Sequence, residues 1–377
     1  MTQPRAATAE GTLRYKNRFQ GVAAAGHFRE SQGLWMSSIG LGSYLGNPDE
    51  RGDEGYRSAV KRASELGCNV FDTASNYRFQ RSERNFGDAF ADLFAQGKLS
   101  RDEVVVTTKG GYIPFDSHPP RGREALVAYL EETFIRPGIC RREDFVQGSH
   151  CMTPSYLAHQ LDQSLRNLKL DAVDVYYLHN PESQLAEVSP EGFYKRLHAA
   201  FEFLESAVAA GKISMYGTAT WDGYRVPPGS PEFLSLERIA ETARAVAGDD
   251  HHFKVVQLPF NLAMPEALAN ANQPIGQREV ALLEASADLG VTVMASASIL
   301  QSRLAAGLPL ELGDFLKGPR TDAQRAIQFT RSAPGIVTAL VGMSHIAHVE
   351  ENLELVRAAP ASAEEFRNLR AAFGLMR

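Results

Sequence analysis

Eight short runs rich in β-branched residues recur along the chain, and longer stretches with helical spacing of apolar residues follow them. The strand candidates are residues 37–42, 70–72, 104–108, 173–178, 213–217, 255–259, 292–297 and 336–341. The helix candidates are residues 54–66, 82–95, 154–168, 192–210, 234–247, 277–289, 322–331 and 347–356. Strands that alternate with helices favour parallel β-α units, and eight such units close into a barrel. The sequence therefore predicts an α/β fold, a single-domain (β/α)8 TIM barrel.

Three segments depart from a minimal barrel. Residues 1–36 are expected to form an N-terminal extension with a hairpin over the bottom of the barrel, and residues 37–377 the barrel itself. Residues 110–153 form a long loop after the third strand, with a helix-like piece at 123–134. Long loops at a barrel mouth are usually functional, so we expect this one to act as a lid. Residues 363–373 are predicted to form an extra C-terminal helix.

The composition excludes several classes of protein. A net charge of -6 without a basic block gives no electrostatic support for binding nucleic acid. No apolar run approaches the ~20 residues that cross a bilayer, and the N-terminus lacks the apolar core of a signal peptide. The three cysteines fit reduced thiols, so we expect a cytoplasmic protein away from membranes. The pairs His150-Cys151 and His251-His252 have no second ligand set, so no metal is expected.

Four polar residues lie at or just beyond the ends of three consecutive strand candidates. Asp72 closes the second run, Tyr77 follows five residues later, and Lys109 and His179 end the third and fourth runs. All strands of a parallel barrel open on one face at their C-terminal ends, so these side chains can converge there. Each alone fits a structural role equally well, for example an ion pair between Asp72 and Lys109. Together, an acid, a phenol, an ammonium and an imidazole suit protonation of a carbonyl oxygen as hydride arrives.

The four residues divide the work of such a reaction. A free tyrosine has a pKa near ~10 and is a weak acid at neutral pH. A lysine ammonium at about 4 Å, in an effective dielectric of ~20, stabilises the phenolate by roughly 4 kcal/mol, or nearly ~3 pKa units at most. Lys109 is therefore expected to lower the pKa of Tyr77 and make it a general acid. Asp72 would keep Lys109 charged, and His179 would orient the carbonyl group.

The same residues carry a resemblance to a known family. The stretch 71–77 (Phe-Asp-Thr-Ala-Ser-Asn-Tyr) is followed by Ser82-Glu83 and Gly87, while Thr-Thr precedes Lys109 and Asn-Pro follows His179. From about Met36 to the last helix the chain resembles the aldo-keto reductase family. The resemblance implies that Asp72, Tyr77, Lys109 and His179 are catalytic. It also implies reduction of an aldehyde or ketone to the alcohol, or the reverse, by direct hydride transfer.

The resemblance implies a nicotinamide cofactor that lies extended across the barrel mouth, with NADP(H) favoured and NAD(H) as the alternative. No G-x-G-x-x-G follows a strand, so a Rossmann site has no support. Gln257 would hold the carboxamide and Phe260 would stack on the nicotinamide ring. The full set of cofactor-binding residues that the resemblance implies is Thr220, Gln257, Phe260, Ala297, Ile299, Gln301, Leu304, Gly342, Ser344, His345, Glu351 and Asn352.

Three positions differ from the family pattern. After the fifth strand, Ala219-Thr220 replaces the usual Ser-Asn, and only the threonine can offer a side-chain hydrogen bond. After the seventh strand, the segment 295–298 (Ala-Ser-Ala-Ser) replaces the usual aromatic residue and proline. His345 stands where NADPH-using members usually place arginine or lysine, and a neutral histidine binds a phosphate less well than arginine does.

The aromatic residues that follow barrel strands are the candidates for the substrate pocket: Tyr44, Phe79, Phe115 and Trp221. The expected partner is a small carbonyl or alcohol, and sugars, steroids, quinones and simple aldehydes all remain open. Two other functions stay open as well. One is a nicotinamide-binding regulatory or sensor subunit with little turnover, as in the channel-associated members of the family. The other is a barrel lyase or isomerase that uses Lys109 as a Schiff base.

Overall fold

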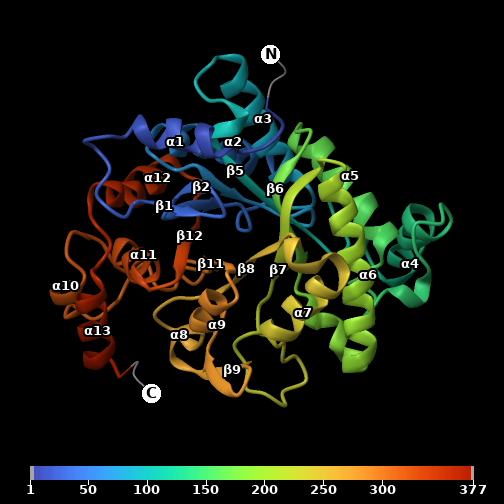
Figure 1. The fold of residues 1–377 in the computed structure, drawn as a ribbon. Helices are drawn as coiled ribbons and strands as arrows, with labels where there is room; N and C mark the ends of the chain where they lie inside the picture. The colour runs from blue at the N-terminus through green and yellow to red at the C-terminus, as the bar shows by residue number, and fades with distance from the viewer. Residues whose placement is uncertain (1–3, 375–377) are drawn as a thin grey trace.

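The centre of the molecule is a closed barrel of eight parallel strands, seen in a computed structural model that describes residues 4–374 (Figure 1). The strands follow one another around the barrel in chain order. They are β3 Ile39–Gly42, β4 Val70–Asp72, β5 Val105–Gly110, β6 Val173–His179, β7 Ile213–Ala219, β8 Phe253–Pro259, β11 Thr292–Ser296 and β12 Ile336–Gly342. The (β/α)8 barrel expected from the sequence is confirmed, and each strand candidate overlaps one barrel strand.

Helices cover the outside of the barrel (Figure 1). The main ones are α2 Glu50–Glu65, α3 Arg81–Ala95, α5 Pro154–Leu168, α6 Pro190–Ala209, α7 Leu236–Ala247, α9 Leu282–Asp288, α11 Asp322–Ser332 and α12 Ile346–Leu353. Short helices α8 Glu266–Ala269 and α10 Leu312–Phe315 lie in the later connections. Several helices begin with a side-chain cap. Thr321, for example, forms a capping box with Gln324 at the start of α11, which satisfies free backbone N–H groups there.

One helix prediction was too long. Residues 277–281 are not the start of a helix, because Arg278–Ala281 form strand β10, which pairs antiparallel with β9 Ala271–Ile275. The two residues between these strands begin with Gly276 at φ 59°, a conformation that glycine adopts without strain. This turn joins the two strands of a hairpin, and helix α9 starts only after the second strand, at Leu282.

The N-terminal extension closes the bottom of the barrel. Strands β1 Phe28–Ser31 and β2 Leu34–Ser37 form an antiparallel hairpin, as expected. Leu34 and Met36 belong to the same buried cluster as Val70 and Val105, which are the first residues of β4 and β5. The hairpin therefore fills the end of the barrel opposite the cavity described below. The extension also holds helix α1 Ala9–Asn17, which the sequence analysis did not predict.

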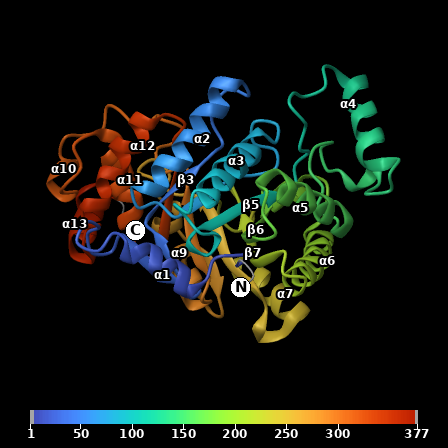
Figure 2. The same ribbon diagram turned by 90° about the horizontal axis from the view of Figure 1, so that it is seen from above.

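The long insertion after β5 folds beside the barrel. Helix α4 Arg123–Leu130 continues into a π-helical turn. It lies outside the ring of barrel helices, on the side of α5 and α6 (Figure 2). Its apolar residues form a small core of their own with α5, in which Phe134 contacts Tyr156. Of residues 110–153, only Tyr112 lines the barrel-mouth cavity. The expected lid is therefore wrong, because the aromatic residues of the insertion pack on one another and on α5.

The predicted C-terminal helix is present as α13 Ala363–Ala372, which lies beside α10 (Figure 1). Residues 1–3 of the expected N-terminal extension (1–36) and residues 375–377 of the expected barrel segment (37–377) lie outside the described residues. Across residues 4–374, no helix is long and apolar enough to cross a membrane.

Candidate active site

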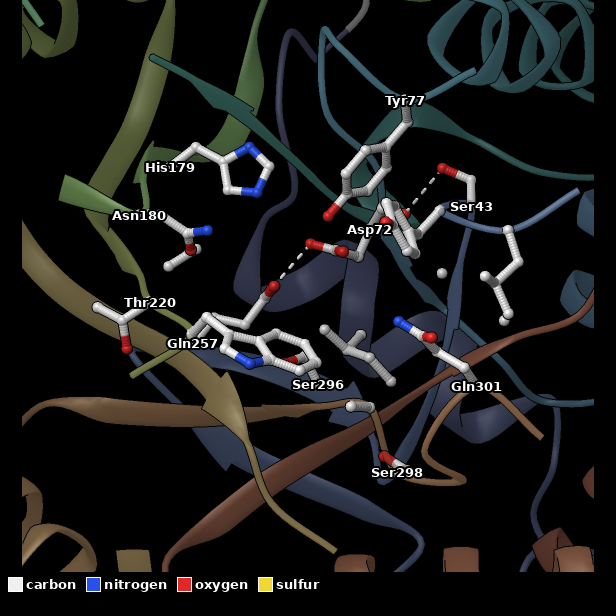
Figure 3. Close-up of a pocket in the computed structure, with 18 of the residues that line it drawn as sticks. Ser43, Asp72, Tyr77, His179, Asn180, Thr220, Gln257, Ser296, Ser298 and Gln301 are labelled. Carbon is white, nitrogen blue, oxygen red and sulfur yellow. Dashed lines mark hydrogen bonds between the residues drawn. The ribbon is translucent and has the colours of Figure 1, made fainter. Parts of the chain in front are cut away.

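A cavity of about 530 Å³ opens where the barrel strands end. Each of the eight strands, or the turn directly after it, contributes residues to its wall. The C-terminal ends of the strands are the face on which barrel enzymes build their sites. In Figure 3, Tyr77, Asp72 and His179 face one side of the cavity, while Ser296, Ser298 and Gln301 lie on the opposite side.

Lys109 and Asp72 form a buried ion pair beneath the side of the cavity that carries Tyr77 and His179. The Nζ of Lys109 donates hydrogen bonds to Oδ2 of Asp72 at 2.6 Å and to the carbonyl oxygen of Thr73 at 2.9 Å. The other carboxylate oxygen of Asp72 accepts from Oγ1 of Thr107 at 2.6 Å and from Nε2 of Gln257 at 2.8 Å. Buried charges are tolerated when they are paired and hydrogen-bonded in this way. The pair is therefore rigid, and both carboxylate oxygens are occupied.

Tyr77 lies directly above this pair. Its ring centroid is 5.0 Å from Nζ of Lys109 and 5.7 Å from the ring of His179, with the two rings nearly perpendicular. The ring of Tyr44 packs edge-on against Tyr77 at 5.0 Å. The structure thus brings together all four residues that the sequence predicted. Lys109 differs from the other three, because it lies behind the cavity wall and not on it.

Burial controls how these groups ionise. It raises the pKa of Tyr77 well above the usual value of 10, and the nearby Asp72 carboxylate raises it further. Burial also lowers the pKa of Lys109, although Asp72 opposes that shift. The net shift of the Tyr77 pKa is therefore upward and not downward as expected, because burial and the Asp72 carboxylate outweigh the attraction of the Lys109 ammonium, which is itself hydrogen-bonded to Asp72 and Thr73. Tyr77 is accordingly a protonated phenol at neutral pH.

His179 is held as a neutral imidazole. Burial lowers its pKa well below 6.5, and the charge of Lys109 acts in the same direction. Its Nδ1 is buried and has no hydrogen-bond partner in the structure. The backbone carbonyl of His179 accepts from Nε2 of His150 at 2.7 Å, while Nδ1 of His150 accepts from Nε2 of Gln184 at 2.8 Å. His150 thus fixes the end of β6, a role that sequence reasoning missed.

The turn after Tyr77 is strained and firmly anchored. Arg78, Phe79 and Gln80 all have left-handed backbone angles, with φ of 47°, 57° and 69°. Such angles are costly for residues other than glycine and persist only where the surroundings enforce them. The buried guanidinium of Arg78 provides this support through hydrogen bonds to Asn47 and Asp53. Strain of this kind is concentrated at functional sites, which agrees with the position of Tyr77.

The residues assigned to the cofactor divide into two groups. Those that line the cavity are Thr220, Gln257, Ala297, Ile299, Gln301 and Gly342. Those that lie outside it are Phe260, Leu304, Ser344, His345, Glu351 and Asn352. Phe260 is fully buried, and its ring stacks on Phe329 with 5.5 Å between the ring centroids. The expectation that this ring faces the cavity is therefore wrong. His345 is exposed, and the carboxylate of Glu351 accepts from Thr321 at 2.6 Å.

Several buried polar atoms at the cavity have no partner in the structure. They are Nδ1 of His179, Oγ1 of Thr220 and Oδ1 of Asn76. Buried polar groups are normally hydrogen-bonded, so these atoms fit a ligand that brings donors and acceptors of its own. A carboxamide and a carbonyl group meet that requirement. Among the described residues, no group of three or more His, Cys, Asp or Glu is placed to hold a metal ion.

The substrate-pocket candidates also divide. Tyr44 and Trp221 line the cavity, while Phe79 and Phe115 do not. Phe79 belongs to the strained turn, and Phe115 packs on Tyr129 in the insertion at 5.3 Å. Sequence reasoning missed a set of lining residues that each follow a barrel strand closely: Ser43, Leu45, Asn76, Tyr112 and Asn180. Their position after a strand, and not their residue type, is the signal that identifies them.

Comparisons with known proteins agree with this geometry. The model of the aldo/keto reductase family matches residues 38–226. D-threo-aldose 1-dehydrogenase from a Pseudomonas species is 30% identical over 190 residues, which cover 49% of this chain and 50% of that protein. The chain therefore matches about half the length of this curated relative. A putative voltage-gated potassium channel subunit beta from Schizosaccharomyces pombe is 24% identical and covers 90% of both chains.

Among solved structures, an aldo/keto reductase from Klebsiella pneumoniae superposes with a TM-score of 0.59 at 21% identity. The match covers 93% of this chain and 96% of that one, and at such low identity it shows a shared fold. The family model spans half of the chain and includes Asp72, Tyr77, Lys109 and His179. The chain belongs to the aldo/keto reductase family.

Proposed function

We propose that the chain is a nicotinamide-dependent oxidoreductase that reduces an aldehyde or ketone to the alcohol, or catalyses the reverse reaction. One observation carries the proposal. The protonated phenol of Tyr77 and the neutral imidazole of His179 face the same cavity, above the buried pair of Lys109 and Asp72, and their ring centroids are 5.7 Å apart. A proton donor and an orienting group at one cavity are what carbonyl reduction requires.

The proposed cofactor is NADP(H), with NAD(H) as the alternative. The Klebsiella aldo/keto reductase, which shares the fold, was solved in complex with NADP, and this supports the proposal. When bound, the cofactor supplies the hydride. The hydroxyl of Thr220 is buried and has no partner, so it would bind the carboxamide of the cofactor. Gln257 lies beside Thr220. Ala297, Gln301 and Gly342 would bind the rest of the cofactor along the wall after β11 and β12.

The residues of the chain would then act on the substrate oxygen. Tyr77 donates its proton to the oxygen as the carbon receives hydride, and it recovers a proton from solvent afterwards. His179 lines the cavity beside Tyr77 and would orient the carbonyl group. The Nζ of Lys109 lies 5.0 Å from the centre of the Tyr77 ring, so its charge would help to stabilise the phenolate that forms. Asp72 positions Lys109 through the 2.6 Å contact.

The proposed substrate is a small uncharged carbonyl compound. Of the residues that line the cavity, Asp72 alone carries a charge, and Lys109 neutralises it. No arginine or lysine among the described residues lines the wall to bind a phosphate or carboxylate. Hydroxyl and amide groups of Tyr112, Asn180 and Ser296 line the cavity and suit a hydroxylated substrate, although Tyr112 and Asn180 also contact each other. Comparing glyceraldehyde with its 3-phosphate tests this, and faster reduction of the phosphorylated member would contradict it.

Label transfer tests the reaction class. NADPH carrying deuterium at the transferable position is incubated with the protein and a panel of aldehydes and ketones. Direct hydride transfer predicts deuterium on the carbinol carbon of the product, one atom per cofactor oxidised. Cofactor oxidation without label in any alcohol would reject the proposed reaction. Asp72→Asn provides the matched control, because it retains the side-chain shape but removes the charge that holds Lys109.

A second candidate is a nicotinamide-binding regulatory subunit with little turnover. The observation that favours it is the match to the channel subunit beta of Schizosaccharomyces pombe over 90% of both chains. The two candidates differ in rate and in assembly. A regulatory subunit would bind the cofactor tightly, show negligible turnover over a broad carbonyl panel, and copurify with a stable partner. An enzyme would turn over repeatedly as the purified chain.

A lyase or isomerase that forms a Schiff base on Lys109 has less support. The Nζ of Lys109 already donates to Asp72 and to the Thr73 carbonyl, and the residue is 1% exposed. A nucleophilic amine must be free and deprotonated to attack a carbonyl carbon. Borohydride reduction in the presence of a ketone would trap a Schiff base as a stable mass increase on Lys109. We expect no such adduct.

A further inference from the structure

A buried glutamate outside the predicted set holds the wall of the cavity. Glu182 lies in the short helical segment Pro181–Ala186 that follows His179 and Asn180. Its Oε1 accepts three backbone N–H groups in succession, from Trp221 at 2.7 Å, Asp222 at 3.2 Å and Gly223 at 3.5 Å. Its second oxygen, Oε2, is buried and has no partner in the structure. One carboxylate thus ties the end of β6 to the turn after β7.

That turn carries two residues of the cavity wall. Thr220 and Trp221 both line the cavity, and Trp221 is 40% exposed. Beyond the contact with Glu182, the backbone of Trp221 is held by Arg225, whose Nη1 donates to the Trp221 carbonyl at 3.0 Å. The indole therefore depends on the turn for its position. Any loosening of the turn changes the shape of the cavity without touching Tyr77 or His179.

We infer that Glu182 is a positioning residue, which fixes the 221–223 turn and so sets how Trp221 and Thr220 meet the substrate and cofactor. This inference rests on the proposed function of the cavity. A carboxylate accepts N–H groups more strongly than a neutral carboxyl group does. The ionised form of Glu182 therefore holds the turn tightly, and protonation loosens it. Glu182 does not contact the reacting atoms.

The surroundings of Glu182 favour a transition near neutral pH. Burial raises its pKa to about 7, although the three N–H groups oppose that shift. The charged and titratable groups on the elements around it are few. Arg225 pairs with Asp222 of the turn and with Glu266 of α8, and Tyr224 is a buried phenol. On the other side of the segment, Gln184 contacts His150, whose pKa burial lowers to about 4, and Arg196 of α6. Burial thus holds the pKa of His150 below, and that of Tyr224 above, the range from pH 6 to 8.

Trp221 itself reports on the turn. The chain has two tryptophans, and Trp35 lies in β2 at the far end of the barrel. In a Trp35→Phe background, the fluorescence of Trp221 and its quenching by acrylamide are measured from pH 5.5 to 8.5. We expect quenching to fall as pH rises, with a midpoint near 7. Glu182→Gln should remove this transition and keep quenching high, because a neutral amide resembles the protonated carboxyl group.

The matched control is Glu187→Gln, which changes an exposed glutamate five residues further along that makes no contact with the turn. It should leave the transition intact. Enzyme kinetics provide the second readout. For the parent protein, KM should fall about fivefold between pH 5.5 and 8.5, the ratio for about 1 kcal/mol of hydrogen-bond energy. For Glu182→Gln, KM should stay high across this range while kcat at saturation follows the parent.

The outcomes separate this inference from the proposed function. If Trp221 titrates in the parent and not in Glu182→Gln, while no carbonyl compound is reduced, the positioning role stands and the proposed reaction falls. If carbonyl compounds are reduced but the quenching profiles of the parent and Glu182→Gln coincide, the inference is wrong. Loss of the transition in Glu187→Gln would equally overturn it, because the transition would then not belong to Glu182.

Discussion

Two parts of the chain build opposite walls of one cavity, and they do so differently. Residues 38–226, which match the family model, supply the aromatic side chains of the cavity and the buried pair of Asp72 and Lys109. Residues 227–374, beyond the match, supply Gln257 and small side chains such as Ser296, Ala297 and Ser298. Figure 3 shows Tyr77 and His179 on the first wall and Ser296 and Ser298 on the second.

The second wall is shaped largely by its backbone. Ala297, Leu300, Gln301 and Ser302 all have left-handed backbone angles, with φ between 44° and 71°. A wall made of backbone and small side chains presents N–H and carbonyl groups, which do not depend on residue type. The difference teaches that the side chains of the first wall can be recognised from the sequence, whereas the backbone groups that the second wall presents cannot.

The largest effect is expected at the buried pair. Lys109→Met should abolish turnover and reduce the free energy of unfolding by about 3–5 kcal/mol, because it leaves the Asp72 carboxylate buried without its cation. Lys212→Met is the control, since Lys212 and Asp162 form an exposed pair at the same 2.6 Å distance. That change should cost no more than about 1 kcal/mol. Equal losses in urea unfolding for the two variants would contradict the contrast.

A smaller effect is expected at Glu182, in the same part of the chain. Its pKa rises on folding from 4.5 to about 7, because the cost of burying its charge exceeds the gain from the stronger hydrogen bonds that the ionised form makes to the turn. Its contribution to stability is therefore fully present below pH 4.5 and is lost as pH rises through 7. The loss is on the order of 3 kcal/mol at most. Urea unfolding at pH 5 and pH 8.5 should show that Glu182→Gln flattens this dependence; an unchanged slope would refute it.

Phe260 tests the second part of the chain. Because Phe260 stacks on Phe329 in the core, Phe260→Leu should lower the free energy of unfolding by about 1 kcal/mol and leave cofactor affinity unchanged. Tyr44→Leu, on the cavity wall, should do the opposite and raise KM with little loss of stability. A large loss of NADPH affinity in Phe260→Leu, measured by fluorescence titration, would restore its expected stacking role.

The smallest effect is expected at His345. Arginine binds a phosphate through charge-assisted hydrogen bonds, while a neutral histidine binds it less well. His345→Arg should tighten NADPH binding by about 1 kcal/mol, roughly fivefold, and leave NADH binding unchanged. His348→Arg, three residues further along the same exposed surface, is the control. An equal gain for both cofactors would mean that the arginine does not contact the 2′-phosphate.

The sequence predicted the barrel and the meeting of the four polar residues because each depends on local patterns. Strand ends can be recognised, and parallel strands bring their ends together. The surroundings of Tyr77 could not be predicted in this way. Its raised pKa follows from burial by residues distant in sequence, and Lys109 is hydrogen-bonded to Asp72 and Thr73. A sequence identifies an ammonium near a phenol, but not which acceptor receives its hydrogen bonds.

The failures on the other wall have similar causes. Phe260 follows β8 as expected, but the sequence does not show whether its side chain points to the cavity or to Phe329. The insertion after β5 was expected to cover the cavity because of its aromatic residues, yet Phe134 packs on Tyr156 of α5. Glu182 was overlooked because its three partners are backbone groups, which leave no pattern in the sequence.

The central claim is that Tyr77 donates the proton in carbonyl reduction, and the most direct test compares Tyr77→Phe with Tyr112→Phe. Both tyrosines line the cavity, but the hydroxyl of Tyr112 is hydrogen-bonded to the hydroxyl of Ser183 at 3.0 Å. Single-turnover rates with saturating NADPH should fall about 10²–10⁴-fold in Tyr77→Phe, with cofactor binding unchanged. Tyr112→Phe should keep most of the parent rate. Near-normal turnover in Tyr77→Phe would contradict the claim.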